Sequence, residues 1–186
     1  MGRTLLLTIT AAALLMPSCG GTSRPARSTD EFTLTSPAFT DGQRIPKRYT
    51  ALGERLSPPL EWQTVPPGTR SYVLISDYLG PEKPEGVMWI AYNIPDTLKS
   101  LATGAGNSGD SLGLGLPGSA YLGPGGLINR IHRYRITLYA LDTVLDIGRH
   151  MIDADTLRAA MAGRTLDSAH LEFTYEERGG FGHWWK

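Results

Sequence analysis

Alternating apolar and polar positions recur along the chain and predict extended strands. The clearest example is RYRITLYALD at residues 133–142, in which alternation puts one apolar set on a single face: Tyr134, Ile136, Leu138 and Ala140. Similar stretches are rich in Val, Ile, Tyr, Thr and Phe, which favour strands. The expected strands are Phe32–Ser36, Ser71–Asp77, Val87–Ile94, Arg133–Leu141 and Leu171–Glu176.

Only one stretch has the periodicity of a helix. In DADTLRAAMAG, Leu157, Ala160 and Met161 form an apolar stripe, with Asp153 or Asp155 as the N-cap and Gly163 as the stop. Two long segments, residues 56–71 with their prolines and residues 96–131 with nine glycines, show no regular pattern. The chain is therefore expected to be mostly β, with few short helices.

The N-terminal residues resemble an export signal. Arg3 precedes a 12-residue apolar run, Leu5–Met16, which is too short to span a membrane as a helix. The chain's one cysteine, Cys19, follows directly, as in a bacterial lipoprotein signal. We predict lipidation of Cys19 and a membrane-anchored location in the bacterial cell envelope, on the periplasmic side or the cell surface; plain secretion is the alternative.

This prediction sets the domain organisation. Residues 1–18 are the expected lipoprotein signal peptide and residues 19–30 the lipidated cysteine and a flexible, polar tether. Residues 31–178 form one domain, and residues 179–186 are an aromatic C-terminal tail. The tail either folds back over an apolar groove, dips into a membrane interface or stays disordered.

Composition and motifs exclude several classes of function. The formal net charge is zero, so no basic surface indicates nucleic-acid binding. The motif GLGLPG at 113–118 matches G-x-G-x-x-G, but no apolar strand leads into it and Pro117 interrupts it, so no dinucleotide is expected. The four histidines lack metal-ligand spacing. No S-x-x-K motif is present. No cofactor and no metal are expected.

Five motifs occur in an order that resembles one known family: SPPLEW, YNIP, Y-x-G-P, HRY and LYALD. This is the order in the phosphatidylethanolamine-binding protein family, in its bacterial Raf-kinase-inhibitor-like branch. The resemblance covers about residues 32–177. It implies a β-sandwich-like fold with one large and one small antiparallel sheet, and a small pocket for a phosphoryl group or another anion at one end of the large sheet.

The resemblance also assigns residues to that pocket. Carried over position by position, the expected ligand-binding residues are Asp77, Met88, Trp89, Tyr121, Gly123, Pro124 and His132. Two of the departures from the family pattern remove polar groups: Met88 replaces a histidine, and Leu79 replaces the second loop aspartate. Gly125, Gly126 and Ile131 also differ from the pattern. A methionine neither donates an N–H nor carries charge, so the pocket is expected to bind anions weakly.

His132 is open to three interpretations. It is a pocket residue that contacts Asp77 or a bound anion, a structural histidine at the sheet end, or a metal ligand. Its neighbours Arg130 and Arg133 are expected to face solvent, and Trp62 and Trp89 are expected in the core.

Three functions remain open at this point. The first is a non-enzymatic binding or inhibitory module with a small anionic or phosphoryl ligand and a protein partner in the envelope. The second is a cryptic hydrolase that uses Asp77 and His132 as an acid and base. The third is a structural envelope lipoprotein with a vestigial pocket.

Overall fold

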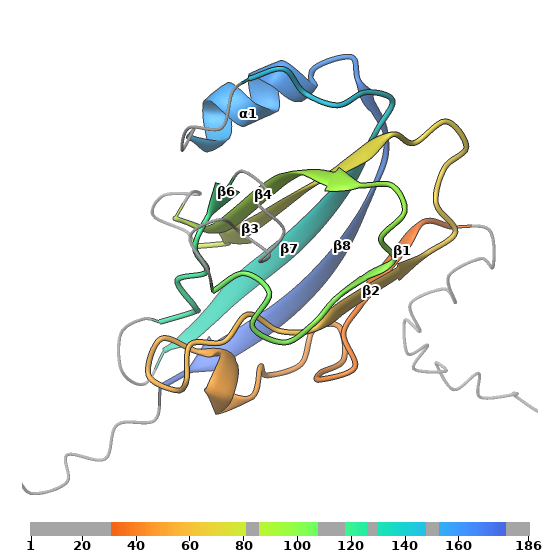
Figure 1. Ribbon diagram of the computed structural model, residues 1–186. Coiled ribbons are helices and arrows are strands. Elements are labelled where there is room, and N and C mark those ends of the chain that lie inside the picture. Colours follow the sequence, from red (N-terminus) through yellow and green to blue (C-terminus); the bar gives the residue numbers. More distant parts are fainter. Residues whose placement is uncertain (1–30, 81–85, 108–117, 126–129, 148–152, 178–186) are drawn as a thin grey trace, which may run out of the picture.

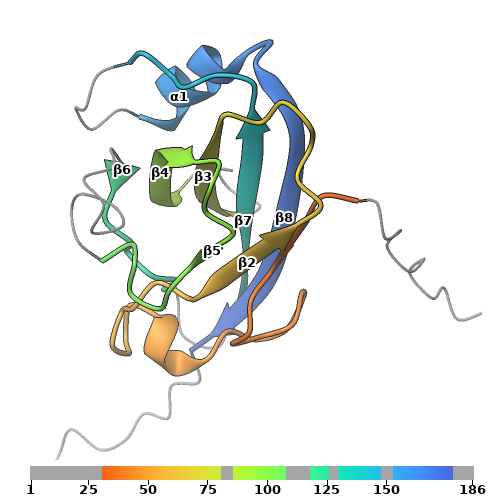
Figure 2. The same cartoon turned by 45° about the vertical axis from the view of Figure 1, so that its right-hand side comes forward.

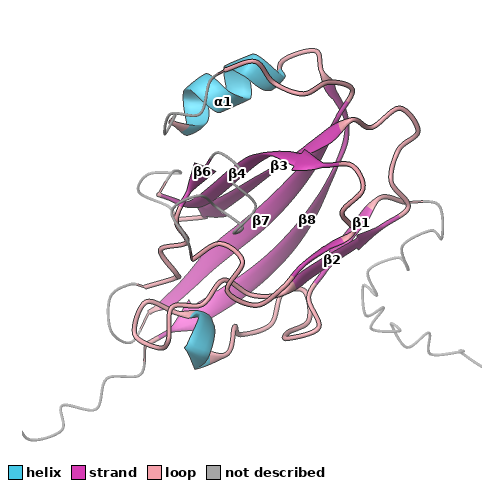
Figure 3. Ribbon diagram, viewed as in Figure 1, coloured by secondary structure: helices cyan, strands magenta, loops and turns pink. Residues whose placement is uncertain are grey.

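The computed structural model describes residues 31–80, 86–107, 118–125, 130–147 and 153–177. Two antiparallel sheets make up most of this part of the chain, together with one short helix and a single 3-10 turn (Figure 3). The expected fold class is therefore confirmed. The predicted signal peptide, the lipidation site Cys19, the tether and the aromatic tail lie outside the described residues.

The larger sheet has five strands in the order β6-β4-β3-β7-β8. The smaller sheet has three strands in the order β1-β2-β5 and packs against one face of the larger sheet (Figures 1 and 2). The elements are β1 (Thr33–Thr35), η1 (Lys47–Tyr49), β2 (Leu60–Gln63), β3 (Ser71–Tyr78), β4 (Val87–Pro95), β5 (Ser100–Leu101), β6 (Gly118–Ser119), β7 (Ile131–Leu141), α1 (Ala154–Met161) and β8 (Thr165–Glu176).

Two apolar cores hold the fold together, one on each face of the larger sheet. The main core lies between the sheets and includes the predicted inward set of β7: Tyr134, Ile136, Leu138 and Ala140. It also buries Trp62 and Trp89, as predicted. The second core lies under α1, which covers the opposite face of the larger sheet (Figure 1). Burial of this apolar surface is the main stabilising contribution, since no disulfide is available.

The helix forms where its end signals predict it. The Asp153 carboxylate accepts hydrogen bonds from the backbone N–H of Thr156 at 2.8 Å and from its hydroxyl at 3.0 Å. These bonds stabilise the charged carboxylate and lower the pKa of Asp153. Leu157 and Met161 bury the apolar stripe, and Gly163 follows the helix with a φ of +71°.

Several short elements were not predicted. β2 lies inside the proline-containing segment expected to be irregular, where Leu60 and Trp62 point inward and alternate with outward residues. β8 starts at Thr165, six residues before the predicted start at Leu171. The prediction missed these residues because the first four are exposed and lack apolar alternation. β5, β6 and η1 are three residues or fewer and leave little pattern to detect.

One extended segment covers the outer edge of β8. The backbone N–H groups of Gly42 and Ile45 donate to the carbonyls of Glu172 and Thr174 at 2.9 and 3.0 Å, and the Thr174 N–H donates to the Gln43 carbonyl at 2.9 Å. These bonds satisfy backbone groups that an edge strand leaves unpaired. They also bring residues 44–47 beside the C-terminal end of β8. No helix among the described residues is long and apolar enough to cross a membrane.

Candidate functional site

The predicted site residues gather at one end of the larger sheet, where β7 begins and β3 and β8 end. The register pairs Tyr78 of β3 with Tyr134 of β7, and His132 of β7 with Tyr175 of β8. Two segments pack against this sheet end: residues 121–125, and residues 47–53 that include η1. Their backbones are joined by a hydrogen bond from the Ala51 N–H to the Pro124 carbonyl at 2.9 Å.

His132 lies at this end, in contact with Tyr78. The side chain is 9% exposed and points to the same face of the sheet as Tyr134. Its Nδ1 hydrogen-bonds with the Tyr78 hydroxyl at 3.1 Å, and the two ring centroids are 5.7 Å apart. The imidazole is therefore oriented by a neutral phenol.

Asp77 does not face His132, and the predicted contact between them is wrong. Successive side chains of a strand point to opposite faces, so Tyr78 and Asp77 are separated by the sheet. Asp77 lies on the face covered by α1, where its carboxylate forms an ion pair with Arg158 at 2.9 Å. Its side chain is 17% exposed and that of Arg158 is 34% exposed. Asp77 thus links the sheet to the helix.

Tyr78 is the site residue that the sequence analysis missed. The expected strand ended at Asp77, one residue before it, whereas β3 ends at Tyr78. Its ring contacts that of Tyr134, with centroids 5.3 Å apart, and Tyr134 stacks on Phe173 at 5.5 Å. This row of aromatic rings connects the site to the main core and holds the Tyr78 hydroxyl in place.

Met88 and Trp89 both contact the core on the His132 side of the sheet. Neighbouring residues of a regular strand would point to opposite faces. Here the pairing shifts between Ser76 and Asp77, so that β4 has an irregularity at Met88. Trp89 is fully buried and meets the Tyr121 ring edge-on at 5.7 Å. Met88 is half-buried, so it adds apolar surface to the wall of the site.

Two buried polar atoms lie on this same wall. Ser76 and Trp89 are directly paired across β3 and β4. The Ser76 hydroxyl and the Trp89 indole N–H have no hydrogen-bond partner within the described ranges. A buried donor without a partner costs about 1–3 kcal/mol. Both residues are fully buried, so each group adds this cost to the folded state.

The loop with Tyr121, Gly123 and Pro124 is fixed by backbone hydrogen bonds. The Leu122 N–H donates to the Met88 carbonyl at 3.0 Å, which ties the loop to β4. The Tyr121 hydroxyl donates to the Tyr49 carbonyl at 2.7 Å. Gly123 has a φ of +75°, and a Cβ there would approach the Ala51 nitrogen to 2.9 Å, so only glycine fits. The loop is thus a rigid part of the site.

The hydroxyl of Tyr134 anchors the next residue of the same loop. It donates to the Gly125 carbonyl and accepts from the Gly125 N–H at 3.2 Å. Burial raises the pKa of Tyr134 to about 12 and also raises that of Tyr121. Both hydroxyls are therefore neutral at ordinary pH. Since both hydroxyls already donate within the protein, the polar side chains that the site offers are the Tyr78 hydroxyl and the His132 imidazole, and Asp77 adds no anionic charge on this face.

The remaining predictions for this region concern arginines and metals. Arg130 and Arg133 are exposed, as expected. Arg133 follows His132 and so points to the other face of the sheet. Within the described part of the chain, no cluster of three His, Cys, Asp or Glu side chains is arranged to hold a metal ion.

Comparison with known proteins identifies one family. A family model described as phosphatidylethanolamine-binding protein matches residues 35–176. A UPF0098 protein of Methanothermobacter thermautotrophicus is 41% identical over 145 residues, which cover 74% of this chain and 94% of that protein. A UPF0098 protein of Chlamydia pneumoniae is 38% identical over 152 residues, covering 77% of this chain and 98% of the relative.

Two solved structures have the same fold. A phosphatidylethanolamine-binding protein homolog from Chlamydia trachomatis matches with a TM-score of 0.68 and 31% identity, over 80% of this chain and 99% of its own. The Escherichia coli protein YbcL, described as a member of the mammalian family, matches with a TM-score of 0.70 and 23% identity, over 80% and 99% of the two chains. The second likeness supports the fold alone.

Proposed function

Because this chain belongs to the phosphatidylethanolamine-binding protein family, we propose that it is a non-enzymatic binding module with a weak site for a small anion or phosphoryl head group. The observation that carries the proposal is the Tyr78–His132 pair at the sheet end, 3.1 Å apart. The pair provides hydrogen-bond donors beside the aromatic wall and the rigid loop at Gly123.

The way in which the Tyr78 hydroxyl binds an anion depends on whether the His132 imidazole is protonated. A protonated imidazole donates from Nδ1 to the phenol oxygen, which leaves the phenol O–H to donate outward. A phosphate oxygen is a suitable acceptor for that hydrogen bond. Met88 supplies no donor, which supports weak affinity, in the millimolar range or about −4 kcal/mol.

The geometry favours binding over the hydrolase alternative. A general acid and a general base must reach the same substrate within hydrogen-bonding distance. Asp77 and His132 are on opposite faces of the larger sheet, and Asp77 is engaged by Arg158 at 2.9 Å. The pair on which the alternative depended therefore does not form.

The cellular setting belongs to the proposal as well. The basic N-terminus, the apolar run Leu5–Met16 and Cys19 support export and a lipid anchor in the bacterial cell envelope. A binding domain held there would meet ligands and protein partners of the envelope, which supports a binding or inhibitory role. The labelling experiment on Cys19 in the Discussion tests this part separately.

The binding proposal is tested by NMR titration with phosphorylethanolamine and with inorganic phosphate. We expect millimolar affinity, with the largest shifts at His132, Tyr78 and Gly125. His132→Gln should weaken binding at least about threefold, since a charge-assisted hydrogen bond is lost. His170→Gln, on the same sheet but outside the site, is the matched control. Shifts elsewhere, or no shifts at a ligand concentration 20-fold above the expected Kd of about 1 mM, would instead support a structural protein with a vestigial pocket.

A further inference from the structure

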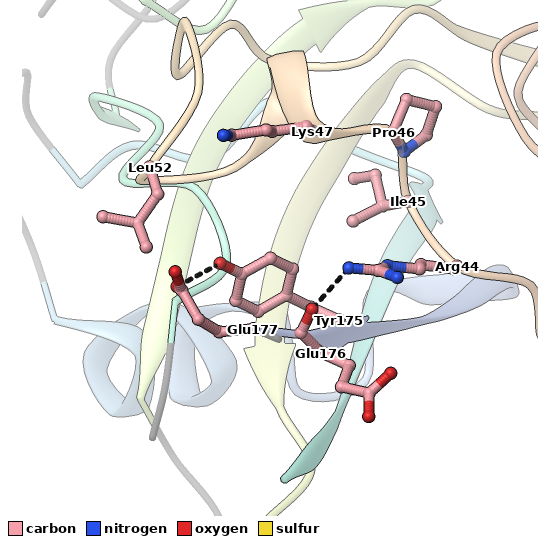
Figure 4. A pocket seen from close by; sticks show the side chains of 8 residues that line it. All are labelled: Arg44, Ile45, Pro46, Lys47, Leu52, Tyr175, Glu176 and Glu177. Atoms are coloured by element: carbon pink, nitrogen blue, oxygen red, sulfur yellow. Dashed lines mark hydrogen bonds between the residues drawn. The ribbon is translucent and has the colours of Figure 1, made fainter. Parts of the chain in front are cut away.

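A cavity lies between the segment 44–47 and the C-terminal end of β8 (Figure 4). Its volume is about 350 Å³, at the lower end of the range of about 300–1,000 Å³ for small-molecule sites. None of the proposed anion-site residues lines it. The lining residues are Arg44, Ile45, Pro46, Lys47, Leu52, Tyr175, Glu176 and Glu177.

The walls of this cavity are held by backbone contacts. The Ile45 N–H donates to the Thr174 carbonyl at 3.0 Å, and the Arg44 guanidinium donates to the Glu176 carbonyl at 2.5 Å. Ile45 and Tyr175 are buried and give the cavity an apolar base. Leu52 adds an apolar wall and is 56% exposed. The cavity therefore has a fixed base and an open, apolar side.

Four charged residues line the cavity, Arg44 and Lys47 with positive charge and Glu176 and Glu177 with negative charge, so the lining is neutral overall. The Glu177 carboxylate accepts a hydrogen bond from the Tyr175 hydroxyl at 2.7 Å, which orients it (Figure 4). Burial and this carboxylate raise the pKa of Tyr175 to about 12, so the hydroxyl stays a donor. Across the described residues, neither Glu177 nor the Lys47 ammonium takes part in an ion pair.

We propose that this cavity binds a small zwitterion with an apolar side chain, such as a free α-amino acid of the size of leucine. Its ammonium would pair with Glu177, its carboxylate with Lys47, and its side chain would cover Ile45 and Leu52. A simple anion would be repelled by Glu177 and a simple cation by Lys47. A zwitterion satisfies both charges, so the arrangement selects for it.

The test is an NMR titration of the protein purified from the producing cell in mild detergent, with three probes. The first probe is leucine, the second is N-acetylleucine, which lacks the ammonium, and the third is leucinamide, which lacks the carboxylate. We expect leucine to bind in the millimolar range and to shift the signals of Ile45 and Tyr175. Each analogue should bind at least about threefold more weakly, the effect of one partly exposed ion pair.

Variants assign each charge. Lys47→Gln should weaken leucine at least about threefold and should not weaken leucinamide, because leucinamide has no carboxylate to lose a partner and is no longer repelled by the Lys47 charge. Glu177→Gln should weaken leucine and should not weaken N-acetylleucine, for the corresponding reason. The matched control is Arg48→Gln: Arg48 neighbours Lys47 but contacts Glu54 at 3.5 Å and does not line the cavity.

Three results would overturn this inference: equal affinity for all three probes, no shifts at Ile45 and Tyr175, or leucine shifts confined to Tyr78 and His132. The last result would assign the zwitterion to the proposed anion site instead. Phosphate is expected to shift the signals of Tyr78 and His132, and leucine those of Ile45 and Tyr175. Either proposal can therefore be refuted while the other stands.

Discussion

The hydroxyl of Tyr78 and Nδ1 of His132 lie 3.1 Å apart, at the point where β3 ends and β7 begins. Tyr78→Phe removes this hydrogen bond and keeps the ring contacts with His132 and Tyr134. We expect the free energy of unfolding to fall by about 1 kcal/mol, the typical contribution of one hydrogen bond. Denaturant unfolding measures this change.

The same variant should alter the His132 ring directly. Without the phenol, the tautomer favoured by the Nδ1 contact loses its partner, so the ring ¹⁵N signals should move. Identical ¹⁵N signals in the wild type and in Tyr78→Phe would show that the two side chains do not interact in solution.

Arg158 contacts two aspartates, and only one of them should contribute much to stability. The Asp77 carboxylate is 17% exposed and lies 2.9 Å from the guanidinium, whereas that of Asp155 is 85% exposed and lies 3.4 Å away. Double-mutant cycles with Arg158→Met should give a coupling energy of about 0.5–1 kcal/mol with Asp77→Asn and less with Asp155→Asn.

Asp77→Asn also tests which face Asp77 occupies. Its largest chemical-shift changes should fall on α1, and the His132 ring signals should change little because the sheet lies between them. The opposite distribution of changes would restore the contact between Asp77 and His132.

Alkaline pH should destabilise the protein in part through Tyr134. Burial raises the pKa of this tyrosine from 10.0 to about 12. Between these values the unfolded chain loses the proton while the folded protein keeps it, so stability is intact below pH 10 and declines toward pH 12. Tyr134→Phe should show a shallower decline in the free energy of unfolding above about pH 10.

The control for this pH dependence is Tyr139→Phe, on the same strand but the opposite face. It should decline as steeply as the wild type. Equal slopes in all three proteins would contradict the role of Tyr134.

The sequence pattern showed which residues point inward only where the pattern alternates between apolar and polar positions. In β7 the alternation from Tyr134 to Ala140 showed directly which residues point inward. β3 is different, because it is buried on both faces from Ser71 to Ser76 and shows no alternation. Its pattern therefore did not reveal that Tyr78, and not Asp77, shares a face with His132.

The partners of these residues come from distant parts of the chain. Arg158 is 81 positions from Asp77 and reaches it only because α1 packs on that face of the sheet. The cavity at Lys47 and Glu177 likewise depends on the segment 41–45 running along β8. No local spacing signals either contact, so both required the three-dimensional structure.

Lipid attachment at Cys19 remains a prediction from the sequence. Cells grown with labelled palmitate should incorporate label into the wild-type protein, because a lipoprotein signal directs acylation of this cysteine. Cys19→Ser should carry no label and should leave the membrane fraction. Label on the variant would refute the lipid anchor, and the alternative of plain secretion would take its place.

Met88→His should strengthen binding of inorganic phosphate at the proposed anion site. Met88 is half-buried and contacts the core on the same face as His132, so an imidazole there lies near the Tyr78–His132 pair. One added charge-assisted hydrogen bond contributes about 1.5 kcal/mol, or roughly tenfold in affinity. The gain should grow below about pH 6.5, where an unperturbed introduced imidazole becomes charged.

Calorimetry measures both effects, with Met88→Leu as a control that keeps the apolar wall and adds no donor. An equal gain in Met88→Leu would show that shape rather than hydrogen bonding limits the site, and micromolar binding by the wild type would contradict the weak anion site itself.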